Sequence, residues 1–195
     1  MPKFPHLSDY DLKSVIAYLR SDMPLVQASS NEAPESNPSF LVKFLCRVAF
    51  KKLDYPKQEI SMPDTNNLVA YGRYLTVGRY DCWTFHSSDF KTLDFVSPEK
   101  TPGYCSGGNT LITPSGSSIF SANITPDEKT GIGTWIEEDF KNVMHSLIRK
   151  DGKALRAPML AYNGLTDNEI KAIWQYLLTV PKVSNEVNRQ WDSKL

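Results

Sequence analysis

The 195-residue sequence lacks the general features of several protein classes. It carries no net charge, with 22 basic and 22 acidic residues, so its composition gives it no overall attraction to nucleic acid or to an anionic membrane. No stretch approaches the ~18 consecutive apolar residues of a membrane-spanning helix. We therefore expect neither a nucleic-acid partner nor a membrane span in this chain, although balanced charge is compatible with a local docking patch.

Cysteine is also scarce. The three residues Cys46, Cys82 and Cys105 are an odd number, which excludes a framework that pairs every cysteine in a disulfide. A Cys46–Cys105 bridge would suit an oxidising compartment, but we favour buried free thiols.

The first residues lack the signature of a secretory signal peptide. The sequence Met-Pro-Lys-Phe-Pro-His at positions 1–6 provides neither a basic start with an apolar stretch nor a small-residue cleavage site. Taken literally, this start predicts a soluble cytoplasmic protein.

Motifs for common enzyme chemistry are missing as well. The segments 106–108 (Ser-Gly-Gly) and 115–117 (Ser-Gly-Ser) contain turn-forming residues but not the lysine of a phosphate-binding loop. A zinc site would need about four ligands at short spacings, and Cys82 with His86 supplies two. No serine or cysteine stands in a recognisable nucleophile motif, so we predict that the protein is not an enzyme.

The most informative feature that is present is an incomplete haem-attachment motif. A c-type haem is normally bound by Cys-x-x-Cys-His, whose cysteines form thioethers and whose histidine ligates iron. Here Cys82 and His86 are kept and Phe85 replaces the second cysteine. Far downstream, Met159 follows a proline and can supply the thioether ligand common in cytochromes c. Structural histidine and core methionine are the alternatives for these two residues, and we favour ligation.

The sequence around this motif resembles a known family. The segments that carry the resemblance are 71–75 (Tyr-Gly-Arg-Tyr-Leu), 123–127 (Asn-Ile-Thr-Pro-Asp), 130–135 (Thr-Gly-Ile-Gly-Thr-Trp) and 165–167 (Leu-Thr-Asp). Together they resemble the cytochrome c domains of multi-haem bacterial electron-transfer subunits, such as the cytochrome subunits of membrane-bound alcohol dehydrogenases. The resemblance covers about residues 60–183.

This resemblance implies a fold, a cofactor and a site. It implies an all-α, cytochrome c-like fold with three main helices around a haem pocket and long loops. The cofactor would be haem c, with iron held by His86 and Met159 and at most one thioether through Cys82. Asn123, Thr125 and Trp135 correspond to family residues around the haem propionates.

The resemblance also implies a function and a location. The protein would be an electron carrier, or an electron-transfer subunit, that exchanges electrons with a redox partner in a dehydrogenase or terminal oxidase chain. Haem c attachment in this family takes place outside the cytoplasm, which implies the periplasm or the outer face of the cytoplasmic membrane. Because this conflicts with the absent signal peptide, we hypothesise a lost upstream segment.

Phe85 leaves three outcomes open. The protein would carry a single-thioether haem c, a noncovalent haem held by His86 and Met159, or no haem at all. In the last case it would be a degenerate domain that acts as a binding or structural module, or a gene fragment.

An internal repeat suggests how the chain is organised. Residues 1–21 align without a gap to 159–179, pairing Met1 with Met159 and Leu7 with Leu165. We therefore interpret residues 1–27 as the C-terminal remnant of an upstream cytochrome c domain, in which Met1 would be an internal axial methionine. Residues 28–65 would form a linker and extended strap, 66–183 the cytochrome c-like domain and 184–195 a tail.

Apolar periodicity and capping residues predict the helices. We expect helices over 8–20, capped by Ser8, and over 40–52, a packing helix rather than a membrane or partner site. In the main domain we expect helices over 66–77, from Thr134 with Glu137 as its capping partner, and from Thr166 with Glu169 completing a capping box. Gly72 would allow the first of these three to cross the last at close range.

Overall fold

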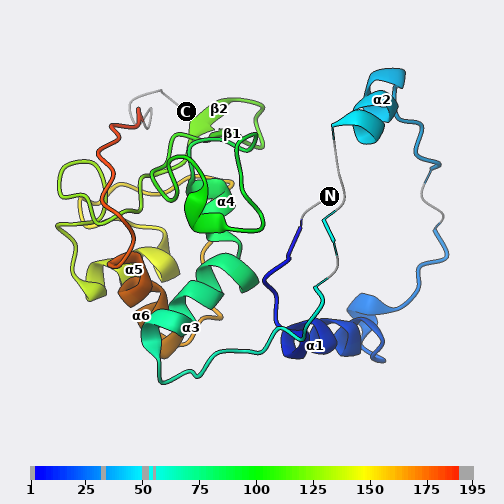
Figure 1. Ribbon diagram of the computed structural model, residues 1–195, viewed down its shortest axis with the longest axis horizontal. Coiled ribbons are helices and arrows are strands. Elements are labelled where there is room, and N and C mark those ends of the chain that lie inside the picture. Colours follow the sequence, from blue (N-terminus) through cyan, green and yellow to red (C-terminus); the bar gives the residue numbers. More distant parts are fainter. Residues whose placement is uncertain (1–2, 32–33, 50–52, 55, 189–195) are drawn as a thin grey trace. The chain divides into compact units, whose positions relative to one another are not determined.

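The computed structural model of the protein describes residues 3–31, 34–49, 53–54 and 56–188 (Figure 1). Its internal contacts divide the chain into two units. Unit 1 consists of the described residues up to Leu7 and those from Met62 onward, and unit 2 of those within Ser8–Ser61. The predicted site residues all belong to unit 1. The predicted remnant, linker and tail stay predictions, and the proposed axial Met1 lies outside the described residues.

Unit 2 contains the helices α1 (Asp9–Leu19), η1 (Pro24–Val26) and α2 (Phe40–Val48). Ser8 caps α1 by accepting a hydrogen bond from the backbone N–H of Asp11 at 3.1 Å, as predicted. The helix expected over 40–52 is seen as α2, and its predicted end at residues 51–52 lies outside the described residues. None of the residues of α1 and α2 is buried, so the predicted packing role of residues 40–52 is not visible in the structure.

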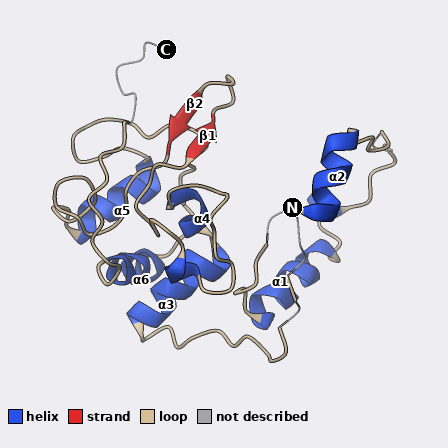
Figure 2. Cartoon of the chain, turned by 45° about the horizontal axis from the view of Figure 1, so that its top comes forward, coloured by secondary structure: helices blue, strands red, loops and turns tan. Residues whose placement is uncertain are grey.

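Two crossed helices form the centre of unit 1. The helix α3 (Leu68–Tyr74) lies side by side with α6 (Asp167–Leu177) in both views (Figures 1 and 2). A side chain at Gly72 would place its Cβ 1.8 Å from the carbonyl oxygen of Ala172, so only glycine fits this crossing. The close approach predicted at Gly72 is therefore confirmed.

The first turn of α6 is fixed by the predicted capping box. The Thr166 hydroxyl accepts from the Glu169 N–H, and the Glu169 carboxylate accepts from the Thr166 N–H at 2.9 Å. The same carboxylate also accepts from the guanidinium of Arg79 at 2.9 Å. Glu169 thus joins the start of α6 to the segment that follows α3.

That segment is a π-helix, η2 (Leu75–Arg79), which continues α3 toward the haem motif. Its residues Leu75, Thr76 and Val77 are buried. π-Helical turns are rare and occur often beside functional sites. After η2 the chain passes Asp81, in the left-handed conformation with φ of 53°, into the short helix α4 (Cys82–His86).

Helix α5 (Glu137–Ser146) packs on α6 and completes the helical part of unit 1. The prediction that it opens at Thr134 with Glu137 as capping partner is wrong. The helix begins at Glu137, and the carboxylate of Asp139 accepts from the N–H of Ile136 at 3.1 Å. Phe140 is buried, with its ring centroid 5.5 Å from that of Trp174.

The prediction of an all-α fold is wrong. Between α4 and α5 the chain forms the short helix η3 (Pro98–Lys100) and two antiparallel strands, β1 (Thr110–Ile112) and β2 (Ser118–Phe120), in register Thr110 with Phe120 (Figure 2). These segments are rich in β-branched and aromatic residues, which suit strands. The turn-forming residues at 115–117 lie in the connection between the two strands of this hairpin.

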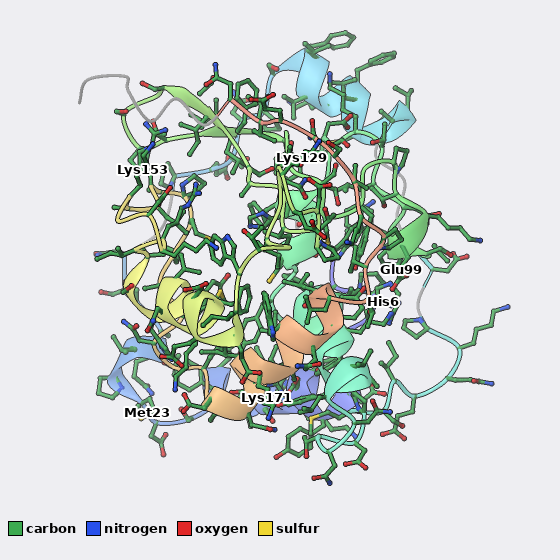
Figure 3. All side chains as sticks on the ribbon, turned by 90° about the vertical axis from the view of Figure 1, so that its left-hand side faces the viewer. His6, Met23, Glu99, Lys129, Lys153 and Lys171 are labelled. Carbon is green, nitrogen blue, oxygen red and sulfur yellow. The ribbon has the colours of Figure 1, made fainter. Side chains whose placement is uncertain are left out.

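Within unit 1, the first described residues pack against the segment around Phe95. A ring nitrogen of His6 donates to the carbonyl oxygen of Phe95 at 3.0 Å. His6 lies near Glu99, on the same side of the unit (Figure 3). Burial works to raise the pKa of Glu99, but hydrogen bonding to Arg73 and the charges of Arg73 and His6 hold that pKa below its ordinary value.

None of the described helices combines the length and the apolar character that crossing a bilayer would require.

Candidate functional site

Unit 1 contains a pocket of about 290 Å³ bounded by η2, α4, the hairpin, α5, α6 and the loops between them. Its wall is mostly apolar, and most of the polar groups come from a few side chains. A concave apolar pocket with a few convergent polar groups is the usual form of a cofactor site. Five of the six predicted site residues line it: Cys82, His86, Asn123, Trp135 and Met159.

Helix α4 presents Cys82 and His86, the two residues that match the haem motif, to this pocket. Cys82 and His86 are four residues apart, so they share one face of the helix. The Nδ1 of His86 lies 2.9 Å from the carbonyl oxygen of Ala122, which can only accept a hydrogen bond. Nδ1 therefore carries a proton, and in the neutral imidazole this leaves the lone pair on Nε2, the tautomer that suits metal ligation through Nε2.

The thiol of Cys82 is held in its protonated form. Burial, with a smaller contribution from the charge of Asp81, raises the pKa of Cys82 to about 12. Burial also raises the pKa of Asp81 from 3.8 to about 6. A neutral thiol is a weak nucleophile, so the pocket itself does not activate Cys82.

Phe85 faces the same pocket from the position of the missing cysteine. Its side chain is 44% exposed, and its ring meets that of Phe90 edge-on with centroids 5.8 Å apart. The replacement therefore leaves an aromatic ring, without a sulfur atom, at this edge of the pocket.

Two methionines reach the pocket from different elements. Met159 lies in the loop before α6 and is half-buried, while Met144 comes from α5 and is 5% exposed. Of these two, the sequence predicts only Met159 as a ligand of the iron. The structure brings both thioethers to the same cavity as His86.

Asn123 and Thr125 hold the pocket loop in shape. The Asn123 side-chain oxygen accepts from the Thr125 hydroxyl at 2.7 Å, and its amide donates to the carbonyl oxygen of Val183 at 2.8 Å. Asn185 donates from its side chain to the carbonyl oxygens of Ser106 and Gly107 at 3.0 and 3.1 Å. Thr125 is fully buried and is not among the residues that line the cavity. It supports the wall rather than forming it.

Trp135 and two arginines form a more polar part of the wall. Lys150 lies over the Trp135 ring, with its ammonium nitrogen 6.0 Å from the centroid. Arg149 and Arg156, which sequence reasoning missed, also line the pocket. The only sign of this role in the sequence was their position shortly before Met159. The two arginines reach the same pocket because of the path of the loop that precedes α6.

The residues present fit a haem group. Two donors typical of its iron, an imidazole and a thioether, line one apolar cavity that also contains the Cys82 thiol. Two guanidinium groups in the wall suit the carboxylates of such a ligand. Of the three cysteine thiols, that of Cys105 is buried, that of Cys82 is half-buried and that of Cys46 is exposed, so the expectation of buried thiols is met at Cys105 only.

Comparison with known proteins points to the same family as the sequence motifs. No family model matches the chain. The fructose dehydrogenase cytochrome subunit of Gluconobacter japonicus is 32% identical over 116 residues, which is 58% of this chain and 21% of that protein. The resemblance to cytochrome c subunits of dehydrogenases is confirmed.

Two further relatives carry similar names. The gluconate 2-dehydrogenase cytochrome c subunit of Pantoea cypripedii is 36% identical over 74 residues, 37% of this chain and 17% of that protein. The alcohol dehydrogenase (quinone) cytochrome c subunit of Gluconobacter oxydans is 36% identical over 74 residues, 37% of this chain and 15% of that protein. The chain thus matches about a fifth or less of the length of these relatives.

Proposed function

We propose that the protein is a haem-binding, one-electron carrier that works with a dehydrogenase. The observation that carries this proposal is that His86 and Met159, far apart in sequence, line one apolar pocket together with Cys82. The relatives, which are cytochrome c subunits of dehydrogenases, support the same assignment. By analogy with them, the proposed location is the periplasm or the outer face of the cytoplasmic membrane.

Each residue of the pocket has a defined part in this proposal. Nε2 of His86 and the sulfur of Met159 would hold the haem iron, and Cys82 would form the single available thioether. A bound haem would supply the redox chemistry, since its iron alternates between ferrous and ferric states. The apolar walls exclude water, and a thioether ligand favours a higher reduction potential.

A haem-free module is the second candidate, and Phe85 is the observation that favours it. Attachment of haem c normally involves both cysteines of the motif. The aromatic ring of Phe85 also fills part of the cavity edge. In this case the pocket would serve binding or structure without a redox role.

Absorption spectra separate the two candidates. The full chain would be expressed in a periplasm that contains the haem-attachment factors and measured oxidised and dithionite-reduced, followed by a pyridine haemochrome assay. Haem that resists acid–acetone extraction would support attachment through Cys82, and extractable haem would support a noncovalent site. A folded protein without a Soret band would refute the redox proposal.

Matched variants identify the iron ligands. His86→Ala and Met159→Leu should each change the spectrum or abolish haem uptake. His145→Ala and Met62→Leu are the controls, since they alter the same residue types at positions that do not line the pocket. A normal spectrum for Met159→Leu with a changed one for Met144→Leu would move the sulfur ligand to α5.

A further inference from the structure

One hydroxyl group in the pocket wall is buried without a hydrogen-bond partner among the described residues. It is the hydroxyl oxygen of Thr76, on the π-helix η2. Thr76 is fully buried, and it lines the same cavity as Cys82, His86 and Met159. A buried polar atom without a partner is uncommon in proteins and needs a specific explanation.

The lack of a partner is unusual for a threonine in helical backbone. Such a hydroxyl normally bonds to a carbonyl oxygen three or four residues earlier. Thr84 and Ser87, both also buried, show this pattern: their hydroxyls donate to the carbonyl oxygens of Asp81 at 2.9 Å and Trp83 at 2.6 Å. Thr76 makes no such bond.

We propose that Thr76 is a ligand-contacting residue of this pocket, whose hydroxyl is satisfied by donating a hydrogen bond to an acceptor of the bound haem or of its axial ligands. The inference rests on the proposed haem function. A donor at this position favours the electron-richer, reduced state of the site. Thr76 therefore contributes both to haem affinity and to the reduction potential.

The test is Thr76→Val, which keeps the shape of the side chain and removes the hydroxyl. Haemin would be titrated into full-length protein purified without haem, and the reduction potential of the loaded protein would be measured. Since the hydroxyl is unsatisfied without haem and bonded with it, we expect haemin affinity to fall about tenfold. We also expect the haem-free variant to melt higher by about 3 °C and the loaded variant to have a lower potential.

Two controls separate this role from a packing effect. Thr76→Ser keeps the hydroxyl and should restore affinity and potential. Thr101→Val removes another buried hydroxyl, which accepts from the N–H of Asp94 at 2.9 Å away from the pocket. It should lower the melting temperature and leave haemin affinity unchanged.

The possible outcomes decide between the two proposals. If the wild type binds haemin and Thr76→Val binds it equally well with the same potential, the role of Thr76 is refuted and the haem function stands. If the wild type takes up no haemin, both proposals fall. Titration with iron-free protoporphyrin locates the acceptor of this hydrogen bond. If Thr76→Val also lowers the affinity for protoporphyrin, the acceptor belongs to the porphyrin. If the affinity for protoporphyrin is unchanged, the acceptor belongs to an axial ligand of the iron.

Discussion

Phe85 is the residue on which the type of haem attachment would depend in the proposed site. It lines the pocket from the third position after Cys82, where a second thioether would form, and it is followed directly by His86. The helix α4 already presents Cys82 and His86 to the cavity, so the second cysteine is the one part of the attachment motif that this helix lacks.

Phe85→Cys should therefore restore two-thioether attachment. Expressed with the attachment factors, the variant should carry haem that resists acid–acetone extraction and gives a pyridine haemochrome spectrum of the two-thioether type. Phe90→Cys is the matched control, because Phe90 is similarly exposed, at 47% against 44%, but lies outside the motif. Equal covalent uptake by both variants, or by neither, would contradict the prediction.

At the scale of elements, the crossing of α3 and α6 fixes the frame on which the pocket is built. Gly72→Ala removes a helix-weakening glycine, a gain of roughly 0.5–1 kcal/mol in an unpacked helix. Here the new Cβ would meet the backbone of Ala172, so the helices must separate. We expect a net loss of about 2 kcal/mol and a melting temperature lower by about 4–8 °C.

Thermal unfolding followed by circular dichroism measures this effect. Gly164→Ala is the control, since a Cβ added there meets no atom within 4 Å. An unchanged or raised melting temperature for Gly72→Ala would show that the crossing tolerates a side chain.

The elements that could be predicted from sequence are those set by local rules. The caps at Ser8 and Thr166 act within one helical turn. Gly72 indicated a close helix crossing because a glycine inside a helix otherwise weakens it. The hairpin was missed because strands of three residues, such as Thr110–Ile112, are too short to show the alternation of apolar and polar residues that identifies a strand. Thr76, Arg149 and Arg156 were missed because only the folded chain brings them to one cavity.

For the whole molecule, haem uptake and folding should be linked. A ligand that binds only the folded protein stabilises it by about 2.7 kcal/mol at a concentration a hundred times its dissociation constant. We therefore expect haemin at this concentration to raise the melting temperature by about 5–10 °C. A Soret band without any rise in melting temperature would indicate haem adsorbed to the surface instead of bound in the pocket.

The bonds from Val183 and Asn185 to the pocket loops have a consequence for the order in which the chain folds. These two residues follow every residue that lines the pocket in the sequence, yet they hold Asn123 and the carbonyls of Ser106 and Gly107. The Gly107 N–H in turn donates to the carbonyl oxygen of His86 at 2.6 Å. The loop beside His86 therefore cannot be fastened until residues 183–185 have folded back over it, so a chain that is still extended keeps this loop open.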